Sequence, residues 1–254
     1  MGYRRLLTAL ATLLIWGLAQ AQDDTTPSSS VERGNLAGVW NHSPPDDMRA
    51  YSGWAFSASP PKMTAWGQER YDAAKPTFGP RGVMATESND PVYDCYPPGT
   101  PRVYFHPFPF EIIQLQNRAL MIYEYHHTVR QIYTDGRDHR TDLPPLWVGD
   151  SIGRWEDDTF VVETVNLNDR TWIDREGLPH SEALRLVERL QLIDEDTLRI
   201  DFLFDDPVAF TEPWEARRFY TRVDWDIEDF ACMERNQNAV FDAFEEQIRE
   251  FDGN

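Results

Sequence analysis

Residues 118–135 read RALMIYEYHHTVRQIYTD, and this stretch decides the expected fold. With a period of two, one of its faces is mostly apolar and aromatic: Ala119, Met121, Tyr123, Tyr125, His127, Val129 and Tyr133. The other face is apolar at both ends and ionisable in the middle: Leu120, Ile122, Glu124, His126, Thr128, Arg130 and Ile132. A strand that lines a closed β-barrel has this pattern, since one face fills with side chains or a ligand while the other meets solvent or a covering segment. The stretch therefore predicts one long strand of a barrel.

Short strand patterns separated by polar turns continue around this stretch. They cover residues 110–115, 147–155, 159–165, 184–192, 197–204 and 214–223. Because no helical spacing interrupts them, we expect an antiparallel meander, closed into a barrel or folded as a sandwich. The fold class that we predict is an all-β antiparallel meander barrel.

The spacing becomes helical after Asp224. Apolar residues recur there at three and four positions, at Val240, Phe241, Phe244, Ile248 and Phe251. This pattern predicts an amphipathic helix that lays its apolar stripe on the barrel. The polar face favours packing on the core over binding to lipid, because it carries the acids Asp242, Glu245, Glu246 and Glu250.

A proline-rich segment, residues 42–101, precedes the strands. It cannot form a central strand, because proline gives no hydrogen-bond donor to a ladder. Its density of aromatic residues indicates an ordered wrap across the barrel. A short helix is expected at 64–74 with Thr64 as its N-cap, and residues 35–40 carry a short strand pattern ending in Gly38-Val39-Trp40.

The N-terminus has the pattern of a secretory signal peptide. Arg4 and Arg5 precede an apolar run, Leu6 to Leu18, that is too short to span a bilayer, and an A-x-A cleavage site follows at residues 19–21. We expect residues 1–21 to be removed, 22–34 to form a disordered lead-in, and 35–254 to form one exported domain. General secretion is favoured over the twin-arginine route, since the flanking Ser and Phe of that signal are missing.

The chain is strongly acidic, with a formal net charge of −19 that becomes −21 when residues 1–21, with two arginines and no acids, are removed. Such a surface repels nucleic acid and anionic lipid. No stretch after residue 21 is long and apolar enough for a membrane helix. We therefore expect neither nucleic-acid binding nor membrane insertion, and the sequence does not fix the oligomeric state.

Two cysteines, Cys95 and Cys232, lie in the exported part of the chain. An even number of cysteines in an oxidising compartment predicts a disulfide. It would close a loop of about 137 residues and stabilise the fold by ~4 kcal/mol on the loop-entropy model.

Residues 151–164, SIGRWEDDTFVVET, resemble a family of secreted bacterial proteins to which we can attach no mechanism. The resemblance extends to residues 63–67, 118–137 and 180–184, and so covers most of the exported chain. More distantly, the Gly-x-Trp at 38–40 is similar to the first strand of lipocalin-like barrels. Those barrels include ligand carriers and cofactor-free lyases such as phenolic acid decarboxylases, so the similarity implies a fold and no particular activity.

Two carboxylates interrupt apolar strand faces and are the first candidates for chemistry. Glu188 lies between Leu186 and Leu190, and Glu163 lies between Val161 and Val165. A buried carboxylate needs a hydrogen-bond or cationic partner, or it binds a proton at a raised pKa. The candidate partners are Arg130, Arg189, Arg218, His126, His127 and the tyrosines of residues 118–135. An acid/base pocket and a structural ion-pair network both fit this pattern.

His127 is the candidate general acid/base, because it shares a predicted face with Tyr123, Tyr125 and Tyr133; a histidine satisfied in the core is the alternative. The long connection 166–181 is expected to be a lid over the barrel mouth or an Ω-loop packed on itself. The predicted catalytic residues are His127, Glu188, Glu163 and Arg130. The predicted substrate-binding residues are Glu124, Tyr123, Tyr125, Tyr133, Trp155, Asp169, Trp172 and His180.

Several chemistries lack their sequence marks. The histidines form no H-E-x-x-H, H-x-H or Cys-His cluster, so we expect no metal. Serine-hydrolase, P-loop and dinucleotide motifs are missing as well, so we expect no cofactor. The sequence favours a cofactor-independent lyase or isomerase acting on a small aromatic or apolar organic molecule; the alternative is a non-catalytic carrier of such a ligand. A weaker third hypothesis is an envelope interaction protein that uses its proline-rich wrap.

Overall fold

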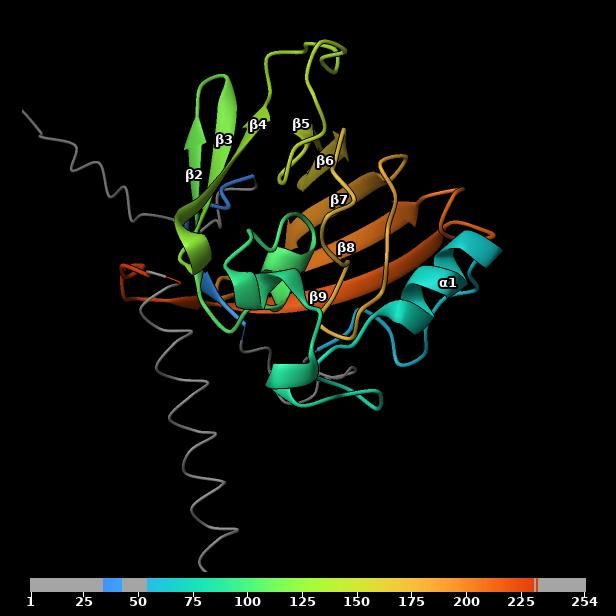
Figure 1. Cartoon of the computed structure of the whole chain (residues 1–254). Coiled ribbons are helices and arrows are strands. Elements are labelled where there is room, and N and C mark those ends of the chain that lie inside the picture. The colour runs from blue at the N-terminus through green and yellow to red at the C-terminus, as the bar shows by residue number, and fades with distance from the viewer. Residues whose placement is uncertain (1–33, 43–53, 231, 233–254) are drawn as a thin grey trace, which may run out of the picture. The chain divides into compact units, whose positions relative to one another are not determined.

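The computed structural model describes residues 34–42, 54–230 and 232. These residues form nine strands that close into one barrel (Figure 1). The prediction of an all-β barrel is confirmed. The expected signal peptide, the lead-in to residue 33 and the C-terminal helix lie outside the described residues. The strands are β1 Gly38–Asn41, β2 Phe110–Leu115, β3 Arg118–Tyr123, β4 Thr128–Tyr133, β5 Asp150–Glu156, β6 Thr159–Val165, β7 Arg185–Leu192, β8 Thr197–Asp205 and β9 Trp214–Val223.

The strands follow one another around the barrel in chain order, and β1 closes it by pairing with β9 as well as with β2. All of these pairs are antiparallel except β4 with β5, where Ile132 lies opposite Ser151 in a parallel pair. The prediction of a purely antiparallel meander is therefore wrong at this point. A parallel pair needs a crossover of a dozen or more residues, and residues 134–149 supply it.

The stretch 118–135 is two strands and not one. β3 ends at Tyr123, a single 3₁₀ turn η5 spans Tyr125–His127, and β4 returns antiparallel, with Tyr123 opposite Thr128. His126 and His127 both have positive φ, at 62° and 48°, a left-handed backbone that turns the chain. The turn also changes the phase of the alternation: odd-numbered residues face inward on β3, whereas even-numbered residues do so on β4.

The segment between β1 and β2, which contains the proline-rich stretch and continues to residue 109, fills the barrel and does not only wrap it. The 3₁₀ turn η4, Arg102–Phe105, is fully buried. The Tyr104 ring packs edge-on against Phe110, Tyr123 and Phe202 of the barrel, at centroid distances of 5.4–5.7 Å. Apolar side chains from the strands and from this segment together fill the interior, and several pairs of aromatic rings among them pack edge to face. These side chains include Trp40, Phe56, Tyr104, Phe105, Phe110, Met121, Phe202, Phe204 and Tyr220.

The described residues include one α-helix, α1 Ala65–Ala73, which lies in the segment between β1 and β2 (Figure 1). The Thr64 hydroxyl accepts a hydrogen bond from the Gly67 N–H at 3.1 Å, which confirms the predicted N-cap. Two 3₁₀ turns follow, η2 Ala85–Glu87 and η3 Pro91–Asp94. Among the described residues, no helix has the length and apolar character that a membrane span requires.

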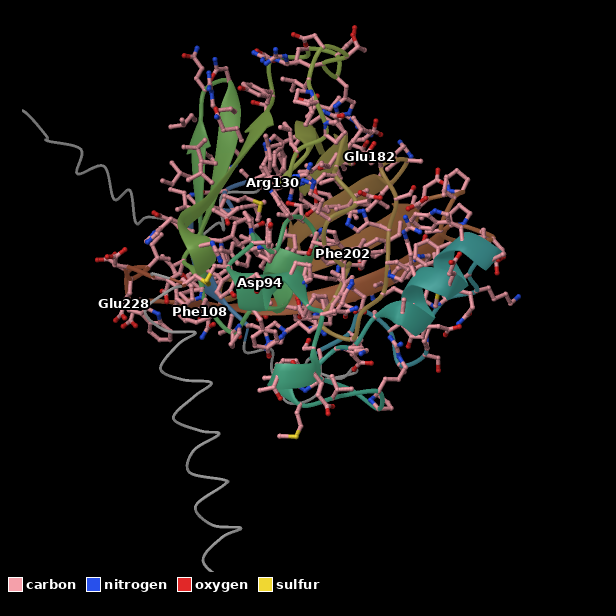
Figure 2. The ribbon with its side chains drawn as sticks, viewed as in Figure 1. Asp94, Phe108, Arg130, Glu182, Phe202 and Glu228 are labelled. Carbon is pink, nitrogen blue, oxygen red and sulfur yellow. A yellow bond between two sulfur atoms is a disulfide. The ribbon has the colours of Figure 1, made fainter. Side chains whose placement is uncertain are left out.

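The predicted disulfide is confirmed. Cys95 and Cys232 are bonded, and Cys232 packs with Tyr125 and Phe230 in a small apolar cluster separate from the main core. Phe108 lies against the same cluster, at the end of the molecule where Figure 2 labels Phe108 and Glu228. The bridge therefore joins the segment between β1 and β2 to the residues that follow β9.

Candidate functional site

Arg130 and Glu188 form an ion pair inside the barrel. Arg130 points inward from β4 (Figure 2), and its Nη1 lies 2.9 Å from Glu188 Oε1, while Nη2 contacts Oε2. The two residues are 1% and 0% exposed. Burying a charge is costly unless it is paired and hydrogen-bonded, and here each carboxylate oxygen has a guanidinium partner.

The remaining polar atoms of this pair are also satisfied. Tyr104 donates to Glu188 Oε1 at 2.7 Å, and Arg130 donates to Ser151 Oγ at 3.0 Å and to Thr164 Oγ1 at 2.6 Å. Burial lowers the pKa of Arg130, but the Glu188 charge and hydrogen bonds outweigh it and raise that pKa. Burial and Glu188 raise the pKa of Tyr104. The network holds a fixed charge pair and a neutral phenol. This geometry is that of a structural ion-pair network and not of an acid/base pocket.

Glu163 lies on the other side of the barrel wall, contrary to the expected buried position. The inner face of β6 carries Phe160, Val162 and Thr164, so Glu163 points outward, where it pairs with Arg185 and lies 3.4 Å from His139 Nε2. Burial raises the pKa of Glu163, but the hydrogen bond and charge of Arg185 together with the interaction with His139 outweigh it, and the pKa is lowered. Glu163 and Glu188 therefore share no site.

His127 lies at an exposed corner and not on an inner face. Its side chain is 55% exposed, and its Nε2 lies 2.6 Å from Asp229 Oδ1. The same nitrogen lies 3.2 Å from the Phe230 N–H, and Glu124 Oε2 accepts from the Glu228 N–H at 2.9 Å. The turn between β3 and β4 thus holds residues 228–230, and the prediction of His127 facing the barrel interior is wrong.

The other predicted binding residues are dispersed. Tyr123 is buried in the core, whereas Tyr133 lies outside under Arg137, at 3.7 Å. Trp155 is 37% exposed and Asp169 is exposed, while His180 is buried and its Nδ1 lies 3.2 Å from the Ser181 carbonyl oxygen. Only Tyr125 and Trp172 belong to the second polar cluster, described next.

This second cluster lies where the proline-rich segment meets the connection 166–181. We call it the wrap cluster, and its members are Asp90, Arg102, His106, Tyr125, Trp172 and Arg175. Asp90 and Arg102 form a two-pronged buried pair, with Arg102 Nη1 2.7 Å from Asp90 Oδ1. The Arg102 guanidinium also lies over the Trp172 ring at 5.0 Å.

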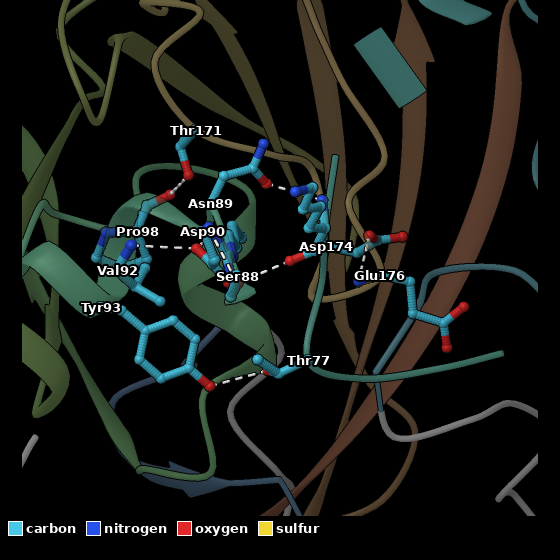
Figure 3. A network of polar contacts seen from close by, with 12 residues as sticks. Thr77, Ser88, Asn89, Asp90, Val92, Tyr93, Pro98, Thr171, Asp174 and Glu176 are labelled. Atoms are coloured by element: carbon cyan, nitrogen blue, oxygen red, sulfur yellow. Dashed lines mark hydrogen bonds and ion pairs between the residues drawn. The ribbon is translucent and has the colours of Figure 1, made fainter. Parts of the chain in front are cut away.

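The carboxylate of Asp90 also caps η3. It accepts from the Val92 N–H at 3.1 Å, and the neighbouring Thr171 hydroxyl donates to the Pro98 carbonyl at 2.8 Å (Figure 3). Asp174 accepts from the Glu176 and Leu178 N–H groups, at 2.9 and 3.2 Å. These bonds order the connection 166–181 against the proline-rich segment.

Arg175 has no carboxylate partner in the described part of the chain. Its guanidinium lies 3.8 Å from the Phe78 ring centroid and 4.5 Å from that of Trp54, and these two rings stack at 4.2 Å. Burial and the nearby Arg102 lower the pKa of Arg175 to about 10. Among the residues that the structure describes, no acid forms an ion pair with Arg175. Rings hold this charge by cation–π contact.

His106 has a buried ring nitrogen without a partner. The imidazole stacks on the Tyr125 ring, with centroids 3.8 Å apart and planes 14° apart. Its Nε2 is buried and has no hydrogen-bond partner among the residues that the structure describes. Burial, and then the charges of Arg102 and Arg175, lower the pKa of His106 well below its ordinary value. At neutral pH this imidazole is uncharged.

The wrap cluster holds two guanidinium groups and one carboxylate, in a protein of net charge −19: Arg102 and Arg175 accompany Asp90. Asp174 lies close enough to Arg102 to interact with its charge, and it adds a second carboxylate when it is ionised. Burial also raises the pKa of Tyr125 to about 12, so that its hydroxyl stays protonated. The arrangement offers a positive charge, aromatic surfaces and a neutral imidazole. In the part of the chain that the structure describes, no group of three or more His, Cys, Asp or Glu residues could hold a metal ion.

Sequence reasoning missed four members of this cluster: Asp90, Arg102, His106 and Arg175. Our search followed polar residues within strand alternation, whereas these four lie outside the strands. Their signal was local composition, since His106 stands among Phe105, Pro107 and Phe108, and Arg175 follows Trp172 by three residues.

The fold and this cluster define a disulfide-bonded β-barrel whose loops bring arginine, imidazole and aromatic side chains together. Neither a comparison with models of known protein families nor one with curated proteins found a match to this chain.

Proposed function

We propose that the protein binds a small organic anion with an aromatic or apolar body at the wrap cluster, and that it transfers a proton on this molecule as a cofactor-independent lyase or isomerase. The observation that carries the proposal is Arg175, a partly buried cation that lies against two stacked rings and has no acid paired to it in the described part of the chain. A carboxylate or phenolate ligand would provide that missing charge. Guanidinium groups bind such groups through paired, charge-assisted hydrogen bonds.

The rings supply the apolar part of the site. Trp54, Phe78, Tyr125 and Trp172 each lie against a cation or imidazole of the cluster. Aromatic side chains contribute apolar contact area together with a preferred ring geometry. A flat aromatic anion fits this combination better than a sugar or a peptide does.

His106 is the group that would move the proton. A general base must be unprotonated and must have an atom free to contact the substrate. Burial holds His106 in its neutral form, and its Nε2 has no hydrogen-bond partner among the described residues. In an isomerase, His106 would take a proton from one carbon and return it to another. In a lyase, it would take the proton while the leaving group departs with its bonding electrons. A bound anion would raise the affinity of His106 for this proton.

The carrier function is the second candidate, and the barrel itself favours it. Both carboxylates predicted to act as acids or bases, Glu188 and Glu163, are occupied by arginines. A carrier needs only the arginine and the rings of the wrap cluster.

The experiment is calorimetric titration with benzoate, phenylacetate and 4-hydroxycinnamate, followed by analysis of each mixture for chemical change. Arg175→Gln is expected to weaken binding at least tenfold, while the matched variant Arg154→Gln, an exposed arginine on the outer wall, is expected to change it less than twofold. Equal binding by Arg175→Gln, or no binding of any of the three by the unaltered protein, would contradict the proposal.

His106→Gln separates the two candidate functions. In an enzyme this change is expected to abolish turnover while affinity stays within a few fold. In a carrier, the unaltered protein itself converts none of the bound compounds.

A further inference from the structure

One part of the outer barrel wall is apolar. On β2, β3 and β4 the outward positions include five aliphatic residues, which we call the aliphatic face: Ile113, Leu115, Leu120, Ile122 and Val129. Glu111 and Gln131 border this face, opposite Ile122 and Leu120. Register places Ile113 opposite Leu120 and Ile122 opposite Val129, so the side chains are cross-strand neighbours. Leu115 and Val129 are 51% and 49% exposed.

The rest of the outer wall is different. On β5 to β8 the outward positions carry ion pairs, such as Arg189 with Glu156 at 3.0 Å and Arg185 with Glu163. Single exposed apolar residues are ordinary on a protein surface, but a contiguous group of them marks a contact with something else. The aliphatic face is therefore a contact surface.

The described chain ends beside this face. The Phe230 N–H lies 3.2 Å from the ring nitrogen of His127, which precedes Val129 by two residues. Cys232 is held close by through its bond to Cys95 and its contact with Tyr125. The residues that follow Cys232 therefore start near the β3–β4 turn.

We propose that residues 240–251 of the same chain cover the aliphatic face with the apolar stripe Val240, Phe241, Phe244, Ile248 and Phe251. The eight residues from Cys232 to Val240 reach up to ~28 Å when extended, which is several times the spacing between neighbouring strands. Arg118 lies at the end of this face, at the β2–β3 turn, where it can meet the acids of the segment. This inference is independent of the proposed function.

The test places the photo-crosslinker p-benzoyl-phenylalanine at Val129 in the full chain, with a second protein carrying it at Val208 as control. Val208 is 40% exposed and lies between β8 and β9, away from the aliphatic face. After irradiation, peptide mass spectrometry is expected to find position 129 joined to residues 233–254 of the same chain, and position 208 not joined to them.

Further variants in the chain with the crosslinker at position 129 make the result specific. Phe244→Asp is expected to reduce the intramolecular product at least fivefold, whereas Asp242→Asn, on the polar side of the same segment, leaves it unchanged. Products between two chains would assign the face to a second copy and overturn the proposal. If the crosslinker at position 129 reacts with no part of the protein after irradiation, the proposal is overturned as well.

Discussion

Arg130 and Glu188, which lie 58 residues apart in the sequence, meet inside the barrel with every hydrogen-bonding atom of both side chains engaged. The pair joins β4 to β7, and Tyr104 connects it to the segment that fills the barrel. A buried pair of this kind stabilises its fold only as long as both partners are present.

We therefore predict that Glu188→Gln lowers the free energy of unfolding by ~3–5 kcal/mol, because it leaves the Arg130 charge buried without its counter-charge. Urea denaturation measures this loss. Arg189→Gln is the control, since its pair with Glu156 lies in solvent, which screens the charges, and the change is expected to leave the free energy of unfolding nearly unaltered.

Replacing both partners, by Arg130→Met together with Glu188→Leu, is expected to recover a large part of the loss, because no unpaired charge is then buried. If Glu188→Gln is as stable as Arg189→Gln, the pair has no structural role.

The second prediction concerns Gly67 in α1. Replacing a helical glycine by alanine usually stabilises a protein by up to ~1 kcal/mol. Here a Cβ atom at position 67 would lie 2.2 Å from the backbone carbonyl oxygen of Ala209. Gly67→Ala is therefore expected to destabilise the protein by ~1–3 kcal/mol, since overpacking forces the backbone to shift. Gln68→Ala, at an exposed position of the same helix, is the control. The melting temperatures of the two variants are compared by thermal unfolding. A higher melting temperature for Gly67→Ala would mean that α1 does not pack on Ala209.

A third prediction follows from Asp174, whose pKa burial raises to about 6 from the ordinary 3.8. Between these two values the folded protein binds a proton at Asp174 and the unfolded chain does not. The contribution of Asp174 to stability is therefore present at low pH and is lost as pH rises through about 4 to 6. Asp174→Asn removes this dependence, so relative to the unaltered protein it gains up to ~3 kcal/mol between pH 4 and pH 7.

Urea midpoints of both proteins across that range provide the measurement. The difference between them cancels other titrations, including that of His42. Burial and then Arg218 lower the pKa of His42 to about 4, and its effect has the opposite sign, because stability is lost as pH falls. A difference that does not change with pH would place Asp174 in solvent.

The fourth prediction concerns the disulfide. Its sequence separation of 137 residues makes the closed loop long, and Cys95→Ser with Cys232→Ser is expected to cost ~4 kcal/mol of unfolding free energy. Titration of the denatured, unreduced protein should find no free thiol, and two free thiols would contradict the bridge. Arg175→Gln, which lies in a different cluster, should leave the thiol count unchanged.

The sequence alone predicted most of the strands, because a half-buried strand repeats its side-chain pattern every two residues over a short range. The ranges 110–115, 159–165 and 214–223 agree with the structure at both ends. The helix after Thr64 and the bridge from Cys95 to Cys232 are confirmed for the same kind of reason, since caps and paired cysteines are local or countable signals.

Alternation could not show which face of a strand meets the core. Glu163 and Glu188 have equivalent apolar neighbours in the sequence, yet one pairs with Arg185 outside and the other with Arg130 inside. A shift of one residue exchanges the two faces of a strand, and the turn at His126 and His127 made that shift between β3 and β4.

The sequence by itself determined the succession of strands, the helix after Thr64 and the disulfide. Strands and helix follow from short-range patterns, and the disulfide follows from the number of cysteines. Only the tertiary structure decided that the segment between β1 and β2 fills the barrel and that Arg102, His106 and Arg175 gather beside Tyr125. These residues come from separate irregular segments, and no period in the sequence relates them. Their proximity results from closing the barrel, which brings distant loops together and leaves a positive charge among rings.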